Sequence, residues 1–190
     1  MTPGWDIVLF RAVHHGLRHP ALDPVMKFLS EPGALKLPLF GLAAALFLAR
    51  GRRGALALLF CVLTVTVSDQ ANSKGLKPLI RRLRPSVELA DTKPAFGVRR
   101  SYSFPSSHAV NVFAAAPLVR ELYPGGGIAT MALASAVAVS RVYVGDHWPS
   151  DVLVGAALGL WIGWLGRTAL RRAAATIAAR AGGGEPSAGP

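Results

Sequence analysis

The chain has 190 residues, of which 52% are hydrophobic and 16% charged, and its mean hydropathy is +0.39. This composition excludes an intrinsically disordered chain and the solvated surface of an ordinary soluble domain. The net charge of +11 predicts an anionic partner, and with so apolar a composition it favours a membrane protein that handles phosphate over a nucleic-acid binder.

Residues 1–33 mix apolar and charged side chains, with a proline, Pro20, near the middle. This pattern predicts one or two short amphipathic helices with a turn near Pro20. An amphipathic segment of this kind suits a membrane interface and suits packing on the rest of the protein, and we assign it as interfacial. It has no apolar core of about 7–15 residues, so no signal peptide is expected.

Five uncharged apolar runs follow, at residues 37–49, 54–68, 109–119, 122–140 and 152–166. Most are shorter than the roughly 20 residues that span a bilayer, but the charges that end them can lie on the same helices. Too few polar residues are present to solvate a soluble five-helix bundle, which is the alternative. We therefore expect an all-α fold, a polytopic membrane helical bundle of about five transmembrane helices. The single cysteine, Cys61, excludes a disulfide framework, a cysteine zinc site and haem attachment.

The one long polar segment, residues 69–107, separates the second run from the third. We expect it to form an extramembrane active-site loop. Residues 1–172 are expected to form a single membrane-embedded domain. Residues 173–190 are alanine-rich and then rich in glycine, proline and serine, so this tail is expected to be disordered at its end.

If the five runs alternate in direction, six polar residues reach the same membrane face. They are Lys77, Arg84, His108, Arg141, His147 and Asp151. The opposite face keeps a set of arginines, as a cytoplasmic face does under the positive-inside rule. Basic residues on the other, non-cytoplasmic face then need an explanation, and anion binding supplies one.

The first polar motif supplies two cations. Lys77 and Arg84 stand seven residues apart, about two helical turns, so both can lie on one helix face. Arginine offers phosphate oxygens a planar fork and lysine offers a point charge. The alternative is a juxtamembrane patch that attracts anionic lipid.

The second motif, Phe-Pro-Ser-Ser-His, precedes an apolar helix. Pro105 suits the first helical position, and the N–H groups and hydroxyls of Ser106 and Ser107 form an anion site at the positive end of the helix dipole. His108 is placed to protonate a leaving oxygen. The alternative is plain helix capping with a surface histidine.

The third motif is the most specific. Pro149 suits a helix start, which puts Asp151 in the first turn, within reach of His147. A carboxylate on one ring nitrogen fixes the histidine tautomer and leaves the other nitrogen able to attack. Arg141 would neutralise phosphoryl oxygens in the transition state. The alternative is an interfacial ion pair with an incidental histidine.

Together the three motifs resemble the signature of the type 2 phosphatidic acid phosphatase superfamily, the lipid phosphate phosphatases: K-x6-R-P, then P-S-G-H, then S-R-x5-H-x3-D. The residues that match are Lys77, Arg84, Pro85, Pro105, Ser106, His108, Ser140, Arg141, His147 and Asp151. Ser107 stands where the family usually has glycine, which puts the local backbone conformation in question. Within the superfamily the chain looks most like the bacterial undecaprenyl-diphosphate phosphatases.

The resemblance implies a metal-independent phosphatase without a cofactor. His147 would be the nucleophile that forms a phosphohistidine, Asp151 would orient it, and His108 would protonate the leaving oxygen. The phosphate would be held by Lys77, Arg84, Arg141, Ser106 and Ser107. The expected reaction converts undecaprenyl diphosphate to undecaprenyl phosphate and phosphate; phosphatidylglycerophosphate, phosphatidic acid and the 1-phosphate of lipid A are alternative substrates.

The expected partners are a lipid phosphate substrate and membrane lipids, with no nucleic acid; the oligomeric state is not indicated. The expected location is the bacterial inner membrane, with several spans and the site facing the periplasm or the cell exterior. Two other hypotheses stand beside this one. The first is a non-catalytic membrane protein that binds anionic lipid through its basic face, and the second is a soluble vanadate-dependent haloperoxidase.

Overall fold

The computed structural model describes residues 2–31, 41 and 44–182, and every regular element in that part of the chain is helical. The elements are α1 (Gly4–His14), α2 (Asp23–Ser30), α4 (Gly51–Gln70), η1 (Ala71–Leu76), α5 (Lys77–Ile80), α6 (Pro85–Glu88), α7 (Ser107–Leu122), η2 (Pro124–Gly126), α8 (Gly127–Tyr143) and α9 (Pro149–Gly182). The predicted all-α class is confirmed for these residues.

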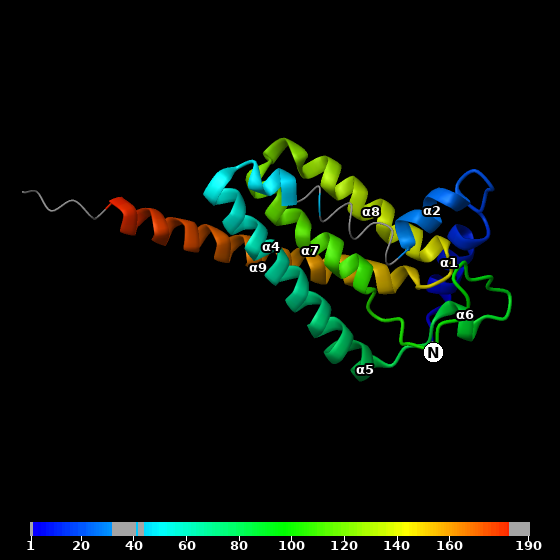
Figure 1. Cartoon of the computed structure of the whole chain (residues 1–190). Helices are drawn as coiled ribbons and strands as arrows, with labels where there is room; N and C mark the ends of the chain where they lie inside the picture. The colour runs from blue at the N-terminus through cyan, green and yellow to red at the C-terminus, as the bar shows by residue number, and fades with distance from the viewer. Residues whose placement is uncertain (1, 32–40, 42–43, 183–190) are drawn as a thin grey trace, which may run out of the picture.

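The long helices α4, α7, α8 and α9 form a bundle in which α7 packs against each of the other three (Figure 1). α4 and α8 run toward the end of the bundle where α1, α2 and α6 lie, whereas α7 and α9 begin at that end. The carboxyl ends of two long helices and the amino ends of two others therefore meet at one end of the bundle, as alternation of the helices predicted.

Three segments in the described part of the chain are long and apolar enough to cross a membrane: Gly51–Glu88, Pro124–Tyr143 and Pro149–Arg180. The run 109–119 lies in α7, whose 16 residues make it shorter than these segments. Residues 37–40 and 42–43 of the first run, 37–49, lie outside the described residues. The expected number of five spans is thus not reached by these segments.

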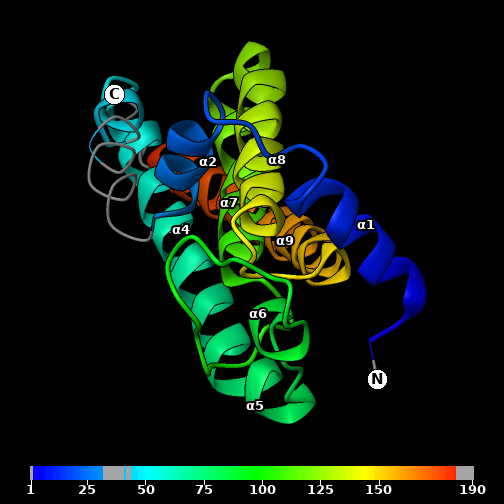
Figure 2. The same ribbon diagram turned by 90° about the vertical axis from the view of Figure 1, so that its right-hand side faces the viewer.

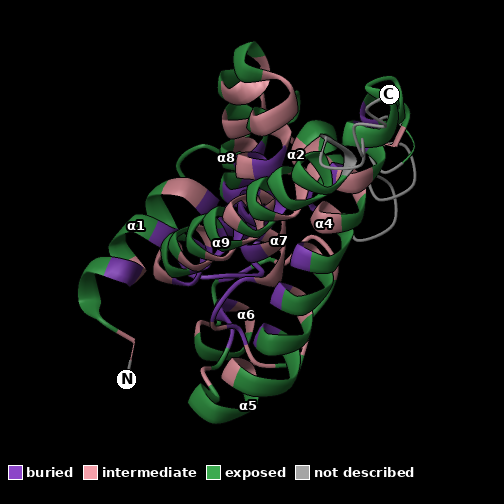
Figure 3. Cartoon of the chain, turned by 90° about the vertical axis from the view of Figure 1, so that its left-hand side faces the viewer, coloured by how far each residue is buried: buried purple, intermediate pink, exposed green. Residues whose placement is uncertain are grey.

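The outer surface of the bundle is apolar. Figure 3 shows exposed residues covering the outward sides of the helices and buried residues on the sides that face one another. Among the exposed side chains are Leu59, Leu63, Trp161 and Trp164, each at least half accessible. Large apolar side chains spread over the outside of a bundle are typical of lipid-facing helices. With the three candidate spans, they indicate a multi-pass membrane protein.

Helix α9 approaches α7 closely through glycines four residues apart. Gly155, Gly159 and Gly163 face α7, and a Cβ atom at Gly159 would collide with the carbonyl oxygen of Val110. Small residues at this spacing let two helix backbones come together in a membrane. The contact continues to Ser106, whose backbone lies against Gly155, so it also places the first turn of α9 beside the start of α7.

The N-terminal segment forms two short helices, as predicted, with the turn that contains Pro20 between them. α1 lies beside α8 and α9 (Figure 2) and buries Asp6, Phe10 and His14. Its other side exposes Trp5 and Val8 to more than half of their area. α1 therefore packs on the bundle and also presents an apolar outer face.

Two of the expected boundaries fall within helices. The polar segment 69–107 does not begin as a loop, because residues 71–80 continue the direction of α4 as η1 and α5. The helix ends where Arg81 adopts a left-handed conformation with φ of 54°. The expected end of the membrane domain after residue 172 also falls inside a helix, since α9 runs on to Gly182.

Candidate active site

The polar motifs converge at the end of the bundle where α8 stops and α9 begins. α5 contributes Lys77, and Arg84 directly precedes α6. α7 begins with Ser107 and His108, α8 carries Arg141 in its last turn, and His147 lies in the connection to α9. Pro149 is the first residue of α9 and Asp151 lies in its first turn, as predicted.

His147 is buried between a carboxylate and a guanidinium. Its Nδ1 lies 3.4 Å from Oδ2 of Asp151, which also accepts the backbone N–H of Trp148 at 2.9 Å. Its Nε2 lies 3.3 Å from Nη1 of Arg84. Because a guanidinium can only donate, Nε2 acts as the acceptor and the ring proton belongs on Nδ1, facing Asp151. His147 thus presents an unprotonated nitrogen toward the cationic side of the site.

The surroundings of His147 keep it neutral. Burial is the main cause that holds its pKa well below the usual range for histidine, and the charges of Arg84, Arg141, Lys77 and His108 add to it in that order. These are the four basic residues that the three motifs predicted. A neutral, buried histidine among cations is suited to attack an anionic electrophile.

Lys77 and Arg84 come together in a different way from the one predicted. They do not share a helix face, because the chain leaves the helix at Arg81. Instead, both side chains bind backbone carbonyls of the segment before α7. Arg84 Nε donates to the Ser101 carbonyl at 2.8 Å, and Lys77 Nζ donates to the Tyr102 carbonyl at 3.3 Å. Arg84 Nη1 also donates to the carbonyl of Asp146 at 2.7 Å. These carbonyls fix the guanidinium beside His147.

Four buried polar atoms in and around the site have no hydrogen-bond partner among the described residues. Two are donors, Nε of Arg141 and Oγ of Ser106, and two are acceptors, Oδ1 of Asp146 and Oδ1 of Asn72. The other nitrogens of Arg141 are held, since Nη1 donates to the Ser30 carbonyl and Nη2 donates to Oδ2 of Asp146 at 2.5 Å. Buried polar groups in proteins are almost always paired, so the two unpaired donors are available to the oxygens of a bound anion.

The start of α7 differs from the prediction. Pro105 is not the first helical residue, because α7 begins at Ser107 and Ser106 stands before it. The N–H of Ser106 donates to the Asp151 carbonyl at 3.0 Å, so this amide is already used, and the hydroxyl is what Ser106 can offer an anion. The hydroxyl of Ser107 accepts a hydrogen bond from Asn72 at 2.9 Å. His108 is half-buried in the first turn.

Residues 54–174 match the family model described as the PAP2 superfamily. The chain belongs to the PAP2 superfamily. The matched range covers well over half of the chain and contains all three motifs, and it confirms the resemblance drawn from them.

Three similar proteins illustrate the range of the PAP2 relatives. An undecaprenyl-diphosphatase of Sulfolobus acidocaldarius is 30% identical over 168 residues, which are 85% of this chain and 77% of that protein. A lipid A 4'-phosphatase of Bacteroides thetaiotaomicron is 36% identical over 110 residues, 54% of this chain and 49% of that protein. The crystal structure of a transmembrane PAP2 type phosphatidylglycerolphosphate phosphatase from Bacillus subtilis superposes with a TM-score of 0.67 at 27% identity, covering 88% and 85% of the two chains. This chain therefore spans about half the length of the Bacteroides relative.

The motif analysis missed several residues that contact the PAP2 motifs. Arg82 donates to Asp151 and to Asp6, and Asn72 donates to the Pro105 carbonyl at 3.3 Å. Asp146 pairs with Arg141. A signal existed for Asp146, an acid next to the predicted nucleophile, and for Arg82, which lies inside the first motif. No local pattern identifies Asp6 or Asn72.

Among the described residues, no group of three histidine, cysteine, aspartate or glutamate side chains is arranged to hold a metal ion. Three carboxylates in and around the site are buried, those of Asp6, Asp146 and Asp151, and each pairs with an arginine. That the reaction needs no metal or cofactor stays a prediction, and phosphate release in the presence of EDTA tests the part that concerns metals.

Proposed function

We propose that this chain is a metal-independent lipid phosphatase that acts through a phosphohistidine, with undecaprenyl diphosphate as its substrate and undecaprenyl phosphate and inorganic phosphate as products. The PAP2 family assignment supports the reaction class. The similarity to an undecaprenyl-diphosphatase over 85% of this chain supports the substrate. Phosphatidylglycerophosphate, phosphatidic acid and lipid A 1-phosphate are the alternatives.

One observation carries the mechanism: the two ring nitrogens of His147 have different partners. Nδ1 faces the carboxylate of Asp151, and Nε2 faces the guanidinium of Arg84. A phosphoryl group bound by that guanidinium would lie next to the nitrogen that carries the lone pair. The carboxylate on the other side stabilises the positive charge that the ring gains on attack.

The reaction has two steps. In the first, the Nε2 lone pair of His147 forms a bond to the terminal phosphorus, the bond to the bridging oxygen breaks, and His108 donates a proton to that oxygen. In the second, water attacks the phosphohistidine while His108 takes its proton, and the phosphorus–nitrogen bond breaks to release phosphate. Asp151 keeps the ring oriented through both steps.

The phosphoryl oxygens are bound by the cations around His147. Lys77, Arg84 and Arg141 lower the pKa of His147, so their charges act at the position of the nucleophile. The unpaired Nε of Arg141 and hydroxyl of Ser106 offer two further donors. The backbone N–H of Ser107, in the first turn of α7, adds a donor at the positive end of the helix.

For the membrane arrangement we propose five transmembrane helices in one domain, residues 1–172, in the bacterial inner membrane. Residues 81–106 cover the site on the side of the periplasm or cell exterior. The end of the bundle away from the site carries arginines in support of this orientation, at Arg52, Arg53, Arg171 and Arg172. The non-enzymatic alternative is a membrane protein that binds anionic lipid through its basic residues.

The test is phosphate release by the full chain, purified in detergent, in the presence of EDTA. Undecaprenyl diphosphate is compared with phosphatidylglycerophosphate, phosphatidic acid and lipid A, for the wild type and for His147→Ala. His15→Ala is the matched control, because His15 is exposed on the surface near Asp91. We expect turnover that resists EDTA, is fastest on undecaprenyl diphosphate, and is lost only in His147→Ala.

Each other outcome has a definite meaning. Turnover by His147→Ala contradicts the phosphohistidine, and sensitivity to EDTA contradicts metal independence. A faster rate on another lipid replaces the proposed substrate. A folded wild type that releases no phosphate from any of the four lipids favours the binding protein.

A further inference from the structure

Asp151 uses its two carboxylate oxygens for different partners. Oδ2 accepts the N–H of Trp148 and lies 3.4 Å from Nδ1 of His147, while Oδ1 accepts a hydrogen bond from Nη1 of Arg82 at 2.8 Å. The side chain is fully buried, and a buried carboxylate oxygen without a donor is costly. Arg82 therefore restrains the rotation of the carboxylate that faces His147.

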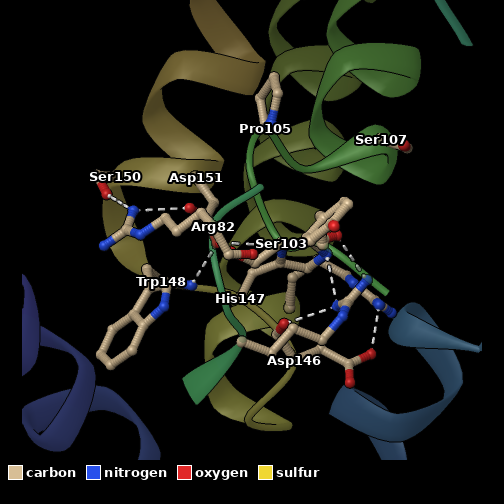
Figure 4. Close-up of polar contacts among 12 residues, drawn as sticks. Arg82, Ser103, Pro105, Ser107, Asp146, His147, Trp148, Ser150 and Asp151 are labelled. Atoms are coloured by element: carbon tan, nitrogen blue, oxygen red, sulfur yellow. Dashed lines mark hydrogen bonds and ion pairs between the residues drawn. The ribbon is translucent and has the colours of Figure 1, made fainter. Parts of the chain in front are cut away.

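Arg82 is itself held from the opposite side by α1. Its Nη2 lies 2.5 Å from Oδ2 of Asp6. Its Nη1 donates to Oγ of Ser150 at 2.5 Å, and its guanidinium lies 5.3 Å from the centre of the Trp148 ring. Figure 4 shows Arg82 beside Ser150, Asp151 and Trp148. The planar fork of a guanidinium lets one side chain bridge two carboxylates. Arg82 thus joins the first turn of α1 to the first turn of α9.

Asp6 is fixed as firmly as Asp151. It is fully buried, its Oδ1 accepts the N–H of Ser150 at 2.9 Å, and its Oδ2 accepts the hydroxyl of the same residue at 2.5 Å. Ser150 directly precedes Asp151 in α9. The two carboxylates that bind Arg82 are therefore both fixed to the first turn of α9, and this turn sets the distance between them.

The contacts of Arg82 distinguish it from the residues that we propose bind phosphate. Its guanidinium bonds go to Thr2, Asp6, Ser150 and Asp151, none of which is among the proposed phosphate ligands. Loss of Arg82 should thus disturb the alignment of the nucleophile more than the affinity for a phosphate group.

We propose that Arg82, anchored by Asp6 of α1, is a positioning residue that keeps Asp151 aligned with His147 during phosphoryl transfer. This inference rests on the proposed function. The ring of His147 gains positive charge as it attacks phosphorus, and a carboxylate that is free to rotate stabilises this charge less well. The N-terminal helix is then part of the active-site framework.

The experiment compares the wild type with Arg82→Ala, Arg82→Lys and Asp6→Asn, as full chains in detergent. The measurements are kcat and KM on the preferred lipid phosphate and the inhibition constant of orthovanadate, which reports binding of a phosphate-like anion. Arg81→Asn is the matched control: Arg81 is exposed, its Nε bonds only the Pro78 carbonyl of its own turn, and asparagine tolerates the left-handed backbone there.

We expect Arg82→Ala to lower kcat about 10- to 100-fold, by analogy with the loss seen when the outer hydrogen-bond partner of a metal-binding histidine is removed. KM and the vanadate constant should change by less than about threefold, since the phosphate ligands are untouched. Arg82→Lys should recover part of kcat, because an ammonium can pair with Asp151 but cannot bridge both carboxylates. Asp6→Asn should lower kcat by a smaller factor, and Arg81→Asn should match the wild type.

Other results overturn the proposal. If Arg82→Ala and Asp6→Asn are folded and have the wild-type kcat, the positioning role of Arg82 is refuted, while the proposed function is not affected. A rise in KM and in the vanadate constant that accounts for the loss would assign Arg82 to phosphate binding instead. An inactive wild type removes the proposed function and this inference together. If elution volume and Tm show that Arg82→Ala is unfolded, the changes in kcat, KM and the vanadate constant of Arg82→Lys and Asp6→Asn test the proposal instead.

Discussion

Nε2 of His147 and Nη1 of Arg84 lie 3.3 Å apart at the end of the bundle where α8 gives way to α9. The contact joins the third motif to the first across 63 residues of sequence. It gives the proposed nucleophile a neighbouring cation that both lowers its pKa and can bind the group it attacks. This arrangement leads to a prediction about pH.

The activity should persist in mild acid. His147 must be neutral to attack, and its pKa lies well below the usual value because of burial first and the charge of Arg84 next. The acid limb of kcat/KM should therefore lie below the ordinary histidine value of about pH 6.5. Arg84→Gln removes the positive charge that contributes most to the lowered pKa of His147, so the acid limb should move to higher pH. Arg84→Lys retains this charge and should leave the acid limb in place.

The measurement is kcat/KM as a function of pH for the wild type, Arg84→Gln and Arg84→Lys. The pH of the acid limb is determined separately from the maximum value of kcat/KM. Both variants lose the arginine fork, so both should be slower than the wild type. A wild-type limb above the ordinary histidine value, or a limb that moves equally in both variants, contradicts the role assigned to charge.

The stability of the protein should fall as the solution becomes acidic, with His14 as one cause. His14 is buried in α1, donates through Nδ1 to the Tyr143 carbonyl at 2.7 Å, and accepts the N–H of Lys93 on Nε2 at 3.3 Å. Burial is the main cause that lowers its pKa. Because the unfolded chain binds the proton more tightly, this contribution is complete above about pH 6.5 and is lost as the pH falls from there toward the folded-state pKa.

Thermal unfolding at several pH values checks this prediction. The Tm of the wild type should drop below about pH 6.5, and His14→Gln should start lower but depend less on pH in that window. His15→Gln is the comparison: its side chain is exposed next to His14, and its charge is a lesser cause of the lowered pKa of His14 than burial, so it should change the pH dependence less than His14→Gln does. An equal pH dependence in wild type and His14→Gln would show that other groups cause the loss.

Asn72 should contribute to substrate binding. Its Nδ2 donates to the hydroxyl of Ser107 and to the carbonyl of Pro105, so it holds the turn before α7 from the side of α4. We expect Asn72→Ala to raise KM about 5- to 150-fold, as loss of a buried hydrogen bond costs about 1–3 kcal/mol. Kinetics on the preferred lipid measure the change. Ser73→Ala, at an exposed neighbouring position, should leave KM unaltered, and an unaltered KM in Asn72→Ala would refute the role.

Gly159 should be required for the packing of α9 on α7. A Cβ atom there would meet the Val110 carbonyl oxygen and would lie 2.9 Å from Cβ of Phe113. Gly159→Ala should destabilise the protein by about 1–3 kcal/mol, because the backbones must move apart. Gly125→Ala is the control, since a Cβ at Gly125 has no neighbour within 4 Å among the described residues. The Tm in detergent measures both, and equal values would disprove the packing argument.

Much of the chemistry could be predicted from the sequence. The order and spacing of the motifs identified the residues around His147, and Pro149 marked the start of α9 so well that the pairing of Asp151 with His147 followed from helix geometry alone. These are local relations within a few residues, which the periodicity of a helix determines. The apolar composition likewise determined the all-helical membrane class.

Other relations depend on tertiary structure. The sequence suggested that Lys77 and Arg84 share a helix face, but the left-handed residue Arg81 ends the helix between them. They meet only because the stretch before α7 folds back and offers both of them carbonyl oxygens. The amide of Ser106, expected to bind phosphate, is instead taken by the Asp151 carbonyl, a contact that exists only because α9 packs closely on α7.

The sequence by itself thus predicted the side chains that we propose for phosphoryl transfer, since motif spacing and residue type are local properties. The tertiary structure alone decided how those side chains are held. Asp6 and Arg82 are 76 residues apart, and Arg82 and Asp151 are 69 apart. No periodicity links positions so distant; only the packing of α1 and α9 against the same turn brings two buried carboxylates to one guanidinium.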